Sequence, residues 1–313
     1  MNPLEILIHE MITENGPLSL ETYMALALTH PVHGYYVSKM PLGQSADFIT
    51  APEISQMFGE LIGLWCAAVW RSMGKPQPLL FVELGPGRGT LMADALRAAR
   101  VAPDFLSAID IHLVETSETL QQCQRIALKD LYQAVSWHAS TEDLPDGPAI
   151  IVANEFFDCL PIRQFVRSTT GWHERLIGLN GDGRLCFGLA PGPEPGLTAP
   201  GEPGQVFEAG LVAARLMSRL AERICLQGGA LLVVDYGFDV PQHGATLQAV
   251  RSHRFADPLG DPGEADLTAH VDFCALARAA RAAGAIVHGP VPQGEWLTRL
   301  GLYERAAKLL EKA

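Results

Sequence analysis

Residues 79–91 constrain the fold of this 313-residue chain more than any other stretch. The stretch begins with Leu-Leu-Phe-Val-Glu-Leu, which is mostly apolar and contains no turn-forming residue, a pattern typical of a buried parallel strand. Gly85, Gly87 and Gly89 follow where such a strand turns sharply into a helix. Glycines let a ligand approach the backbone, and free N–H groups at a helix start favour a carboxylate or phosphate. The stretch therefore predicts a ligand site at the end of a parallel strand.

The spacing of the glycines indicates which ligand binds there. A dinucleotide site requires G-x-G-x-x-G, but here Thr90 stands where the third glycine belongs, so NAD is disfavoured. The form E-x-G-x-G-x-G, with Glu83 inside the strand, resembles the first motif of class I S-adenosylmethionine (SAM) methyltransferases. A different nucleotide site, or a tight turn with glycines for backbone reasons alone, stays open as an alternative.

Length and composition favour one α/β domain of ordinary size with a sizeable insert or appendage. Hydrophobic residues make up 48% of the chain, yet no apolar run approaches the roughly 20 residues that span a bilayer. Residues 1–14 contain Glu5, Glu10 and Glu14 but no Arg, unlike a signal or transit peptide. We therefore expect no targeting segment and no membrane insertion.

Charge and cysteine content narrow the possible partners. The net charge of −12 disfavours nucleic acid, which normally requires a basic face, and suits a cationic substrate. On charge alone, an acidic surface that only keeps the protein soluble is the favoured explanation. The six cysteines are widely separated and form no C-x-x-C pair, so we expect reduced thiols and no structural metal.

Residues 1–74 are predicted to form an N-terminal helical extension with a lid loop. Apolar residues form a helical stripe over residues 4–12, and Ser19 is placed to cap a second helix that ends at His30. A third, long helix with Ile54 on its buried face is predicted to stop at Gly74. Its start has the T-x-x-E spacing of a capping box, which is an alternative to a ligand-binding role for that segment.

Three further strands place polar residues at the predicted ligand edge. Residues 109–114 read as the second strand and end at Glu115, where a carboxylate can accept both hydroxyls of a ribose. Glu115 could instead favour the start of the following helix, with Ser117 as its cap. Residues 135–138 read as the third strand and 148–153 as the fourth. Asp143 and Leu144, between these two strands, are expected beside an adenine.

The fourth strand is followed by Asn154, Glu155, Phe157 and Asp158, which should border the same cleft because ligands bind beyond the carboxyl ends of parallel strands. The alternative is that both acids cap a helix while both phenylalanines, Phe156 and Phe157, pack in the core.

Residues 161–204 change to short strands and a Pro/Gly-rich connection, which predicts an inserted β meander. The core is expected to comprise residues 75–160 and 205–313. It would continue with a helix over 206–226, a fifth strand over 230–234 that ends at the cleft, a further strand over 285–291 and a closing helix over 303–312.

The chain resembles the MidA family of SAM-dependent protein arginine methyltransferases linked to assembly of respiratory complex I. The resemblance covers almost the whole length and rests on residues 33–36, 47–56, 83–91, 154–161, 235–237 and 265–273. It implies a seven-stranded class I (Rossmann-like) doubly wound sheet with added N-terminal helices and an inserted region. It also implies symmetric dimethylation of an arginine in a partner protein, a complex I subunit or its homologue, in the bacterial cytoplasm or the mitochondrial matrix. Ala46 departs from the family, which usually has glycine there, and members tend to continue past the last helix into strands that finish the sheet.

The roles expected for individual residues follow from these arguments together. Glu83, the three glycines, Glu115, Asp143 and Leu144 would bind SAM. Glu155 and Asp158 would hold a guanidinium with help from Asn154, since carboxylates can bind that flat cation in bidentate fashion. The substrate and lid positions are Tyr35, Asp47, Thr50, Glu53, Phe157, Tyr236 and His270.

Two other functions stay open. The residues 154–157, Asn-Glu-Phe-Phe, occupy the position of the Asn/Asp-Pro-Pro-aromatic motif of amino methylases, so the acceptor could be a nucleobase or small-molecule amine. The missing prolines and the acidic charge count against this function. A non-catalytic assembly factor that keeps the fold is the third possibility, against which the intact glycine motif argues.

Overall fold

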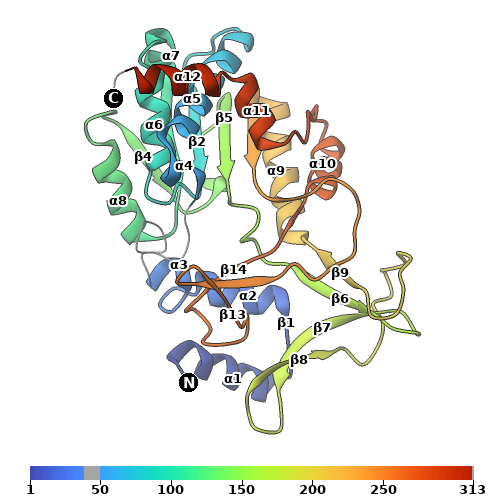
Figure 1. Ribbon diagram of the computed structural model, residues 1–313. Helices are drawn as coiled ribbons and strands as arrows, with labels where there is room; N and C mark the ends of the chain where they lie inside the picture. The colour runs from blue at the N-terminus through green and yellow to red at the C-terminus, as the bar shows by residue number, and fades with distance from the viewer. Residues whose placement is uncertain (39–49, 312–313) are drawn as a thin grey trace.

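The computed structural model describes residues 1–38 and 50–311, and its larger part is built on a parallel sheet (Figure 1). The strands are β2 (Leu79–Leu84), β3 (Ile109–Val114), β4 (Val135–His138), β5 (Ala149–Asn154) and β10 (Gly229–Val234). They lie in the order β10-β5-β2-β3-β4, and every neighbouring pair is parallel. The predicted strands at these positions are confirmed to within one residue. The order reverses between β2 and β5, and in doubly wound sheets this switch point is where ligands bind.

Helices cover both faces of the parallel sheet because its strands are apolar on both sides. One face packs against α5 (Gln56–Ser72), α6 (Thr90–Ala99) and α7 (Pro103–Ala108), with Phe81 and Ile111 among its residues. The other face packs against α9 (Leu211–Gln227) and α10 (Phe273–Ala282), with Leu80 and Val82. The neighbours in β2 thus point to opposite faces, as the two-residue period of a strand requires.

Three further helices belong to this part of the chain: α8 (Glu118–Leu128), α11 (Gln293–Arg299) and α12 (Leu302–Leu310). The last of these is held to α5 by Arg305, whose guanidinium donates to both carboxylate oxygens of Glu60 at 2.6 and 2.7 Å.

An antiparallel arm extends from the core at the lower part of Figure 1. Its main sheet has the order β1-β7-β6-β9, with β8 paired to β7. The bounds of these strands are β1 (Leu18–Ser19), β6 (Arg163–Arg167), β7 (Trp172–Leu179), β8 (Leu185–Leu189) and β9 (Val206–Ala209). A smaller sheet of β12 (Gln248–Arg251), β13 (Arg254–Ala256) and β14 (Asp266–Thr268) lies beside it.

The N-terminal helices α1 (Pro3–Asn15) and α2 (Leu20–Thr29) belong to this arm. Their apolar side chains share a hydrophobic core with residues far along the chain, including Ile177 and Leu267. The hydroxyl of Tyr23 donates to the carbonyl of Pro258 at 2.7 Å, and the side-chain amide of Asn2 donates to the carbonyl of Pro262 at 2.9 Å. The N-terminal helices and the late residues 247–269 therefore form one packed unit.

Several sequence predictions are wrong in detail. The helix predicted over 206–226 divides at Gly210, because residues 206–209 find a strand partner in β6 and only then does α9 begin. No strand forms over 285–291, where Gly289 and Pro290 interrupt the apolar alternation. Ile54 is 73% exposed, because it ends the short helix α4 (Ala51–Ile54) and precedes α5.

Within the described residues, the main parallel sheet has five strands, where the resemblance implies a seven-stranded sheet. Within the same residues, no helix has the length and apolar character required to cross a bilayer.

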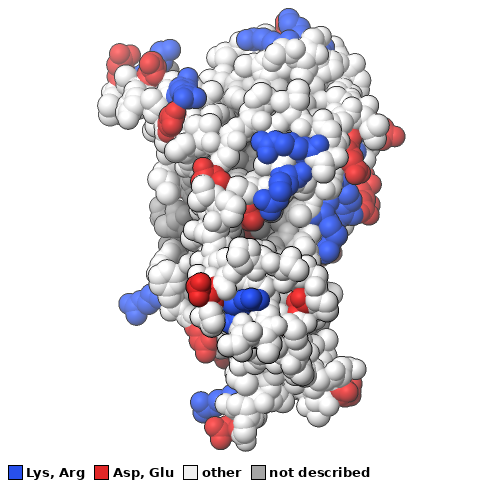
Figure 2. All heavy atoms as spheres, turned by 90° about the vertical axis from the view of Figure 1, so that its right-hand side faces the viewer, with Lys and Arg blue, Asp and Glu red and all other residues white. Residues whose placement is uncertain are grey.

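The negative net charge is unevenly distributed. Figure 2 shows Lys and Arg side chains gathered on the upper part of the face that α9 and α10 form. The exposed arginines of these two helices include Arg215, Arg219 and Arg278.

Candidate active site

Three glycines shape the turn that follows β2. Gly85, Gly87 and Gly89 have φ angles of 60°, 53° and 82°, in the left-handed region where a side chain strains the backbone. A Cβ atom on Gly85 would also lie 2.8 Å from a ring carbon of Phe156. Gly89 is the N-cap of α6, so the helix begins directly after the loop. This geometry presents helix-start N–H groups to an anionic ligand at the switch point.

Glu83 is a carboxylate buried within β2. Its neighbours Val82 and Leu84 face the α9 side, so Glu83 faces the α5 side near the carboxyl end of the strand. Its Oε2 atom has no hydrogen-bond partner among the described residues. Burial raises the pKa of Glu83 to about 8. An open carboxylate oxygen in a buried position is suited to accept a hydrogen bond from a cationic group.

Glu115, at the end of β3, is linked to the glycine loop through Gln124. One oxygen of Glu115 accepts the N–H of Ser117 at 2.9 Å, and the other accepts from Gln124 Nε2 at 3.2 Å. The same Nε2 donates to the carbonyl of Gly87 at 2.7 Å. Ser117 is also the N-cap of α8, as predicted in the alternative explanation of Glu115. The carboxylate and the glycine loop are thereby fixed relative to each other.

The segment before α5 lies against the glycine loop. Glu53 accepts a hydrogen bond from the hydroxyl of Thr90 at 2.6 Å and lies 3.3 Å from the guanidinium of Arg88. Thr50 is the N-cap of α4, but its side chain makes no capping hydrogen bond. The capping box considered for this pair does not form, because Glu53 reaches across to the loop instead. Asp47, the remaining predicted lid residue, lies outside the described residues.

The loop after β5 presents polar groups to the other side of the switch point. Glu155 has a φ of 46°, which is rare for a residue with a side chain, and its Oε1 accepts the N–H of Ala51 at 3.3 Å. Asp158 is 4% exposed. One side-chain oxygen of Asp158 and that of Asn154 are buried without a hydrogen-bond partner among the described residues. The structure thus brings these three predicted acceptor residues together.

The two phenylalanines of this loop point in different directions. Phe157, which we expected to contact substrate, is 3% exposed and packs in the hydrophobic core on the α9 side. Phe156 packs against the same core but is only half-buried and also lies against Gly85, and the two rings meet edge to face at 5.7 Å. The motif alone does not show which of two adjacent aromatic rings the core will bury.

Asp235, directly after β10, holds the loop after β5 in place. Residues 154–158 are called the acceptor loop below, after the role predicted for them. Its Oδ2 accepts the backbone N–H groups of Phe156, Phe157 and Asp158 at 3.2, 3.0 and 3.3 Å. Its Oδ1 accepts the N–H of Tyr236 at 2.9 Å. One carboxylate therefore satisfies four N–H groups and ties the loop after β5 to the end of the neighbouring strand.

The acids of this region share an unfavourable environment for negative charge. Burial raises the pKa of Glu155 and of Asp158, and burial together with the charge of Asp158 raises the pKa of Asp235. Burial and the same charge also raise the pKa of the Tyr236 hydroxyl. A cation placed among these groups would favour their ionised forms, so the cluster is suited to bind one.

The other predicted residues lie in different surroundings. Tyr35 is fully buried in the core of the arm, whereas its neighbour Tyr36 donates to Asp266 at 2.7 Å. The ring of His270 meets that of Tyr236 edge to face at 5.8 Å. Asp143 accepts the N–H of Ser140 in a short 3-10 turn, and Leu144 is buried.

Three residues of this region were not in the predicted site. Asp235 follows an apolar strand in the same way as Glu115, and that signal could have found its role. Gln124 lies inside a helix and Tyr36 contacts a residue 230 positions away, so neither has a local signal.

Comparisons with known proteins agree with this geometry. Residues 61–291 match the profile of a family of S-adenosyl-L-methionine-dependent methyltransferases. Curated relatives include protein arginine methyltransferase NDUFAF7, mitochondrial, from Danio rerio, which is 40% identical over 96% of this chain and 76% of its own length. The Homo sapiens relative of the same name is 36% identical, with 100% of this chain and 77% of its own length covered.

A solved structure is similar as well. A Burkholderia thailandensis protein, described as a methyl transferase and bound to S-adenosyl-homocysteine, has a TM-score of 0.84 at 26% identity. The match covers 97% of this chain and 82% of that chain, so it includes both the core and the arm.

Proposed function

This chain belongs to the family of S-adenosyl-L-methionine-dependent methyltransferases, and we propose that it transfers the methyl group to an arginine of a partner protein. The expectations of a Rossmann-like class I fold and of SAM as cofactor are confirmed. The observation that carries the acceptor proposal is the buried pair Glu155 and Asp158, which lies across the switch point from the glycine loop.

The residues at the switch point fit the cofactor. The open Oε2 of Glu83 would accept a hydrogen bond from the ammonium group, and the helix start after Gly87 would receive the carboxylate. Glu115 would bind the ribose hydroxyls, while Asp143 and Leu144 would lie beside the adenine. When bound, SAM supplies an electrophilic methyl group on its sulfonium sulfur.

The acceptor side would orient a guanidinium. This group stays protonated near neutral pH and offers five N–H donors in a plane. The carboxylates of Glu155 and Asp158 would bind it in bidentate fashion, and the open side-chain oxygen of Asn154 would accept a further N–H. Their grip would turn one nitrogen toward the methyl carbon, so that transfer proceeds in line.

The transfer also requires a base. As the N–C bond forms and the C–S bond breaks, the attacking nitrogen must release one proton. Glu155 is the proposed acceptor of that proton, because burial already raises its pKa above the ordinary carboxyl value.

The partner and the degree of methylation extend the same proposal. The resemblance to the MidA family supports symmetric dimethylation of a respiratory complex I subunit or its homologue. The relatives named as mitochondrial proteins support the matrix as the location in a eukaryote, and the bacterial cytoplasm is the corresponding place in a bacterium.

Glu155→Gln tests the acceptor proposal. We expect methylation of the partner to fall strongly while calorimetry with S-adenosylhomocysteine shows unchanged affinity. Glu222→Gln, an exposed change on α9, is the matched control and should alter neither measurement. Methylation at the normal rate in Glu155→Gln would show the assignment to be wrong.

Mass spectrometry identifies the acceptor. A complex I subunit homologue from cells with the protein should carry dimethylarginine that is missing from cells without it. Binding of nucleic acid at low salt would instead favour a nucleobase amine as the acceptor.

A further inference from the structure

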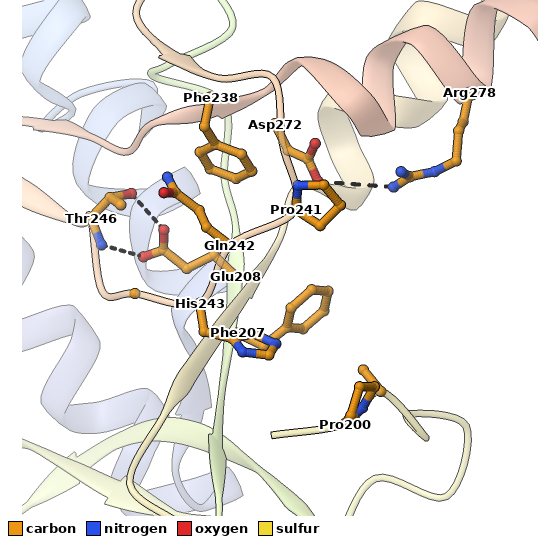
Figure 3. Close-up of a pocket in the computed structure, with 12 residues that line it drawn as sticks. Pro200, Phe207, Glu208, Phe238, Pro241, Gln242, His243, Thr246, Asp272 and Arg278 are labelled. Atoms are coloured by element: carbon orange, nitrogen blue, oxygen red, sulfur yellow. Dashed lines mark hydrogen bonds and ion pairs between the residues drawn. The ribbon is translucent and has the colours of Figure 1, made fainter. Parts of the chain in front are cut away.

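A second pocket lies where the arm joins the core, and Figure 3 shows the side chains around it. Its walls come from β9, from residues 238–246 and from the start of α10, and its volume is about 240 Å³. The aromatic rings of Phe207, Phe238 and His243 line it. Pockets that enclose a whole small molecule usually measure about 300–1,000 Å³, so this one has the size for a single side chain.

The charged groups of the pocket already have partners. Glu208 accepts the backbone N–H groups of Thr246 and Leu247 at 2.9 and 3.2 Å. Asp272 accepts the N–H of Ala275 at 2.8 Å as the N-cap of α10 and lies 3.9 Å from Arg278. These carboxylates differ from those of the acceptor loop, because their charge is committed to the protein itself.

The positive charge of Arg278 at this pocket disfavours a cationic ligand. The guanidinium of Arg278, whose side chain is 66% exposed, lies on the same side of the pocket as Asp272 (Figure 3). It would repel a lysine or arginine side chain. With aromatic walls and no free carboxylate, the pocket suits an uncharged apolar group.

The pocket and the acceptor loop lie along one short strand pair. This pair is β11 (Gly237–Phe238) with β15 (Val271–Asp272), and Phe238 is opposite Asp272. Tyr236 directly precedes β11, two residues before Phe238, and its carbonyl accepts the N–H of Val271 at 3.1 Å. Tyr236 lies beside Asp158, whereas Phe238 lines the pocket. Residues two apart in an extended chain are separated by about 7 Å, which is the backbone spacing between Tyr236 and Phe238.

The opposite strand repeats this arrangement. The ring of His270 contacts Tyr236, and Asp272, two residues later, lines the pocket. The backbone N–H of His270 donates to the hydroxyl of Thr246 at 2.8 Å, which joins the acceptor side to the pocket wall.

We propose that this pocket binds a bulky apolar side chain, aromatic or long aliphatic, two residues from the target arginine in an extended segment of the substrate protein. The inference rests on the proposed function and adds a specificity subsite to it. An extended segment has the same two-residue period as the ladder beneath it, so its arginine and the apolar side chain would face the protein together.

Peptides with one central arginine test the subsite with the full-length protein. The residue two positions before or after the arginine is Phe in one peptide of each pair and Ala in the other. Binding is measured by fluorescence anisotropy with S-adenosylhomocysteine present, and methyl transfer is measured by mass spectrometry. At one of the two positions we expect Phe to improve both the affinity and kcat/KM about 10-fold or more.

Gly244→Leu is designed to fill the pocket. Gly244 lines it, and a Cβ atom added there meets nothing within 4 Å. The variant should lose the preference for Phe while keeping the wild-type rate on the Ala peptide and the wild-type affinity for S-adenosylhomocysteine. Gly192→Leu, which also meets nothing within 4 Å but lies outside the pocket, is the matched control and should keep the preference.

The outcomes separate this inference from the proposed function. Equal binding and methylation of the Phe and Ala peptides at both positions, or a preference that survives Gly244→Leu, overturns the subsite and leaves arginine methylation standing. Peptides that neither bind nor accept a methyl group, together with unmodified arginines in cellular substrates, overturn the proposed function and this inference with it.

Discussion

The two sides of the switch point are built in different ways. The side after β2 and β3 uses residues that are close in sequence, and its groups are mostly satisfied: Gln124 ties Glu115 to the glycine loop. The side after β5 and β10 combines residues 51, 154–158 and 235–236, and it gathers three acids with raised pKa values, Glu155, Asp158 and Asp235. Glu83 on the first side also has a raised pKa and an open oxygen. The first side offers a fixed backbone shape, whereas the second holds negative charge that a cationic acceptor can neutralise. Each of the following changes tests whether the two sides are separable.

The largest effect is expected from Asp158→Asn. The amide keeps the shape of the side chain but removes the charge that would hold a guanidinium, so methyl transfer to arginine should fall about 100-fold or more. The affinity for S-adenosylhomocysteine, measured by calorimetry, should stay within about twofold of the wild type. An equal loss in both measurements would mean that the two sides are one site.

Gly85→Ala should weaken S-adenosylhomocysteine binding about 10-fold or more. Alanine would have to keep the left-handed backbone angles of Gly85, which costs about 1–2 kcal/mol. Its methyl group would also collide with the ring of Phe156. Gly74→Ala is the control, because Gly74 has a φ of 84° and open space around its Cβ position. It should lower stability by a similar backbone cost and leave binding unchanged. Equal binding by both variants would contradict the ligand role of the loop.

Asp235→Asn should lower kcat about 10-fold with little change in cofactor affinity. The amide can still accept some of the loop N–H groups, but it removes the negative charge beside Asp158. The charge of Asp158 raises the pKa of Asp235, so the variant removes the carboxyl of this pair that ionises at the higher pH, and the pH at which kcat/KM reaches half its maximum should move down. In the wild type, kcat/KM should rise with pH, because the acids must ionise to bind the cation. A lower rate without a shifted pH profile would reduce Asp235 to a purely structural role.

The last prediction concerns Glu83 and the stability of the ligand-free protein. Its pKa is about 8 in the fold and near the ordinary value of about 4.3 in the unfolded chain. Between these values the folded state holds the extra proton, so stability should decline as pH rises from about 4.3 to 8 and change little above that range. Glu83→Gln should remove this decline and match the wild type near pH 4, as thermal unfolding can show. A variant with the wild-type slope would refute the assignment.

Each side could be predicted from the sequence only where its contacts join residues that are close along the chain. The glycine loop and the strands around it were predictable because a buried strand and a positive-φ turn each leave a local pattern. The acids after β5 were found from their place at a strand end. The contact of Glu53 with Thr90 depends on tertiary packing, which no local pattern encodes. Asp235 has a local signal in its place after an apolar strand, but the loop N–H groups that it accepts are 77 to 79 residues away. The same limit explains why β9 was predicted as part of a helix: residues 206–209 form a strand because they pair with β6.

The packing of α1 and α2 has a consequence for synthesis. Tyr23 reaches its partner Pro258 only after a further 235 residues have been added to the chain. At about 5–20 residues per second, a ribosome needs on the order of 10–50 s for that length. During this interval the apolar faces around Leu4 and Leu20 lack the late residues that cover them, so they are a natural target for chaperones on the nascent chain. Helices α1 and α2 are thus translated well before the residues that complete their native packing.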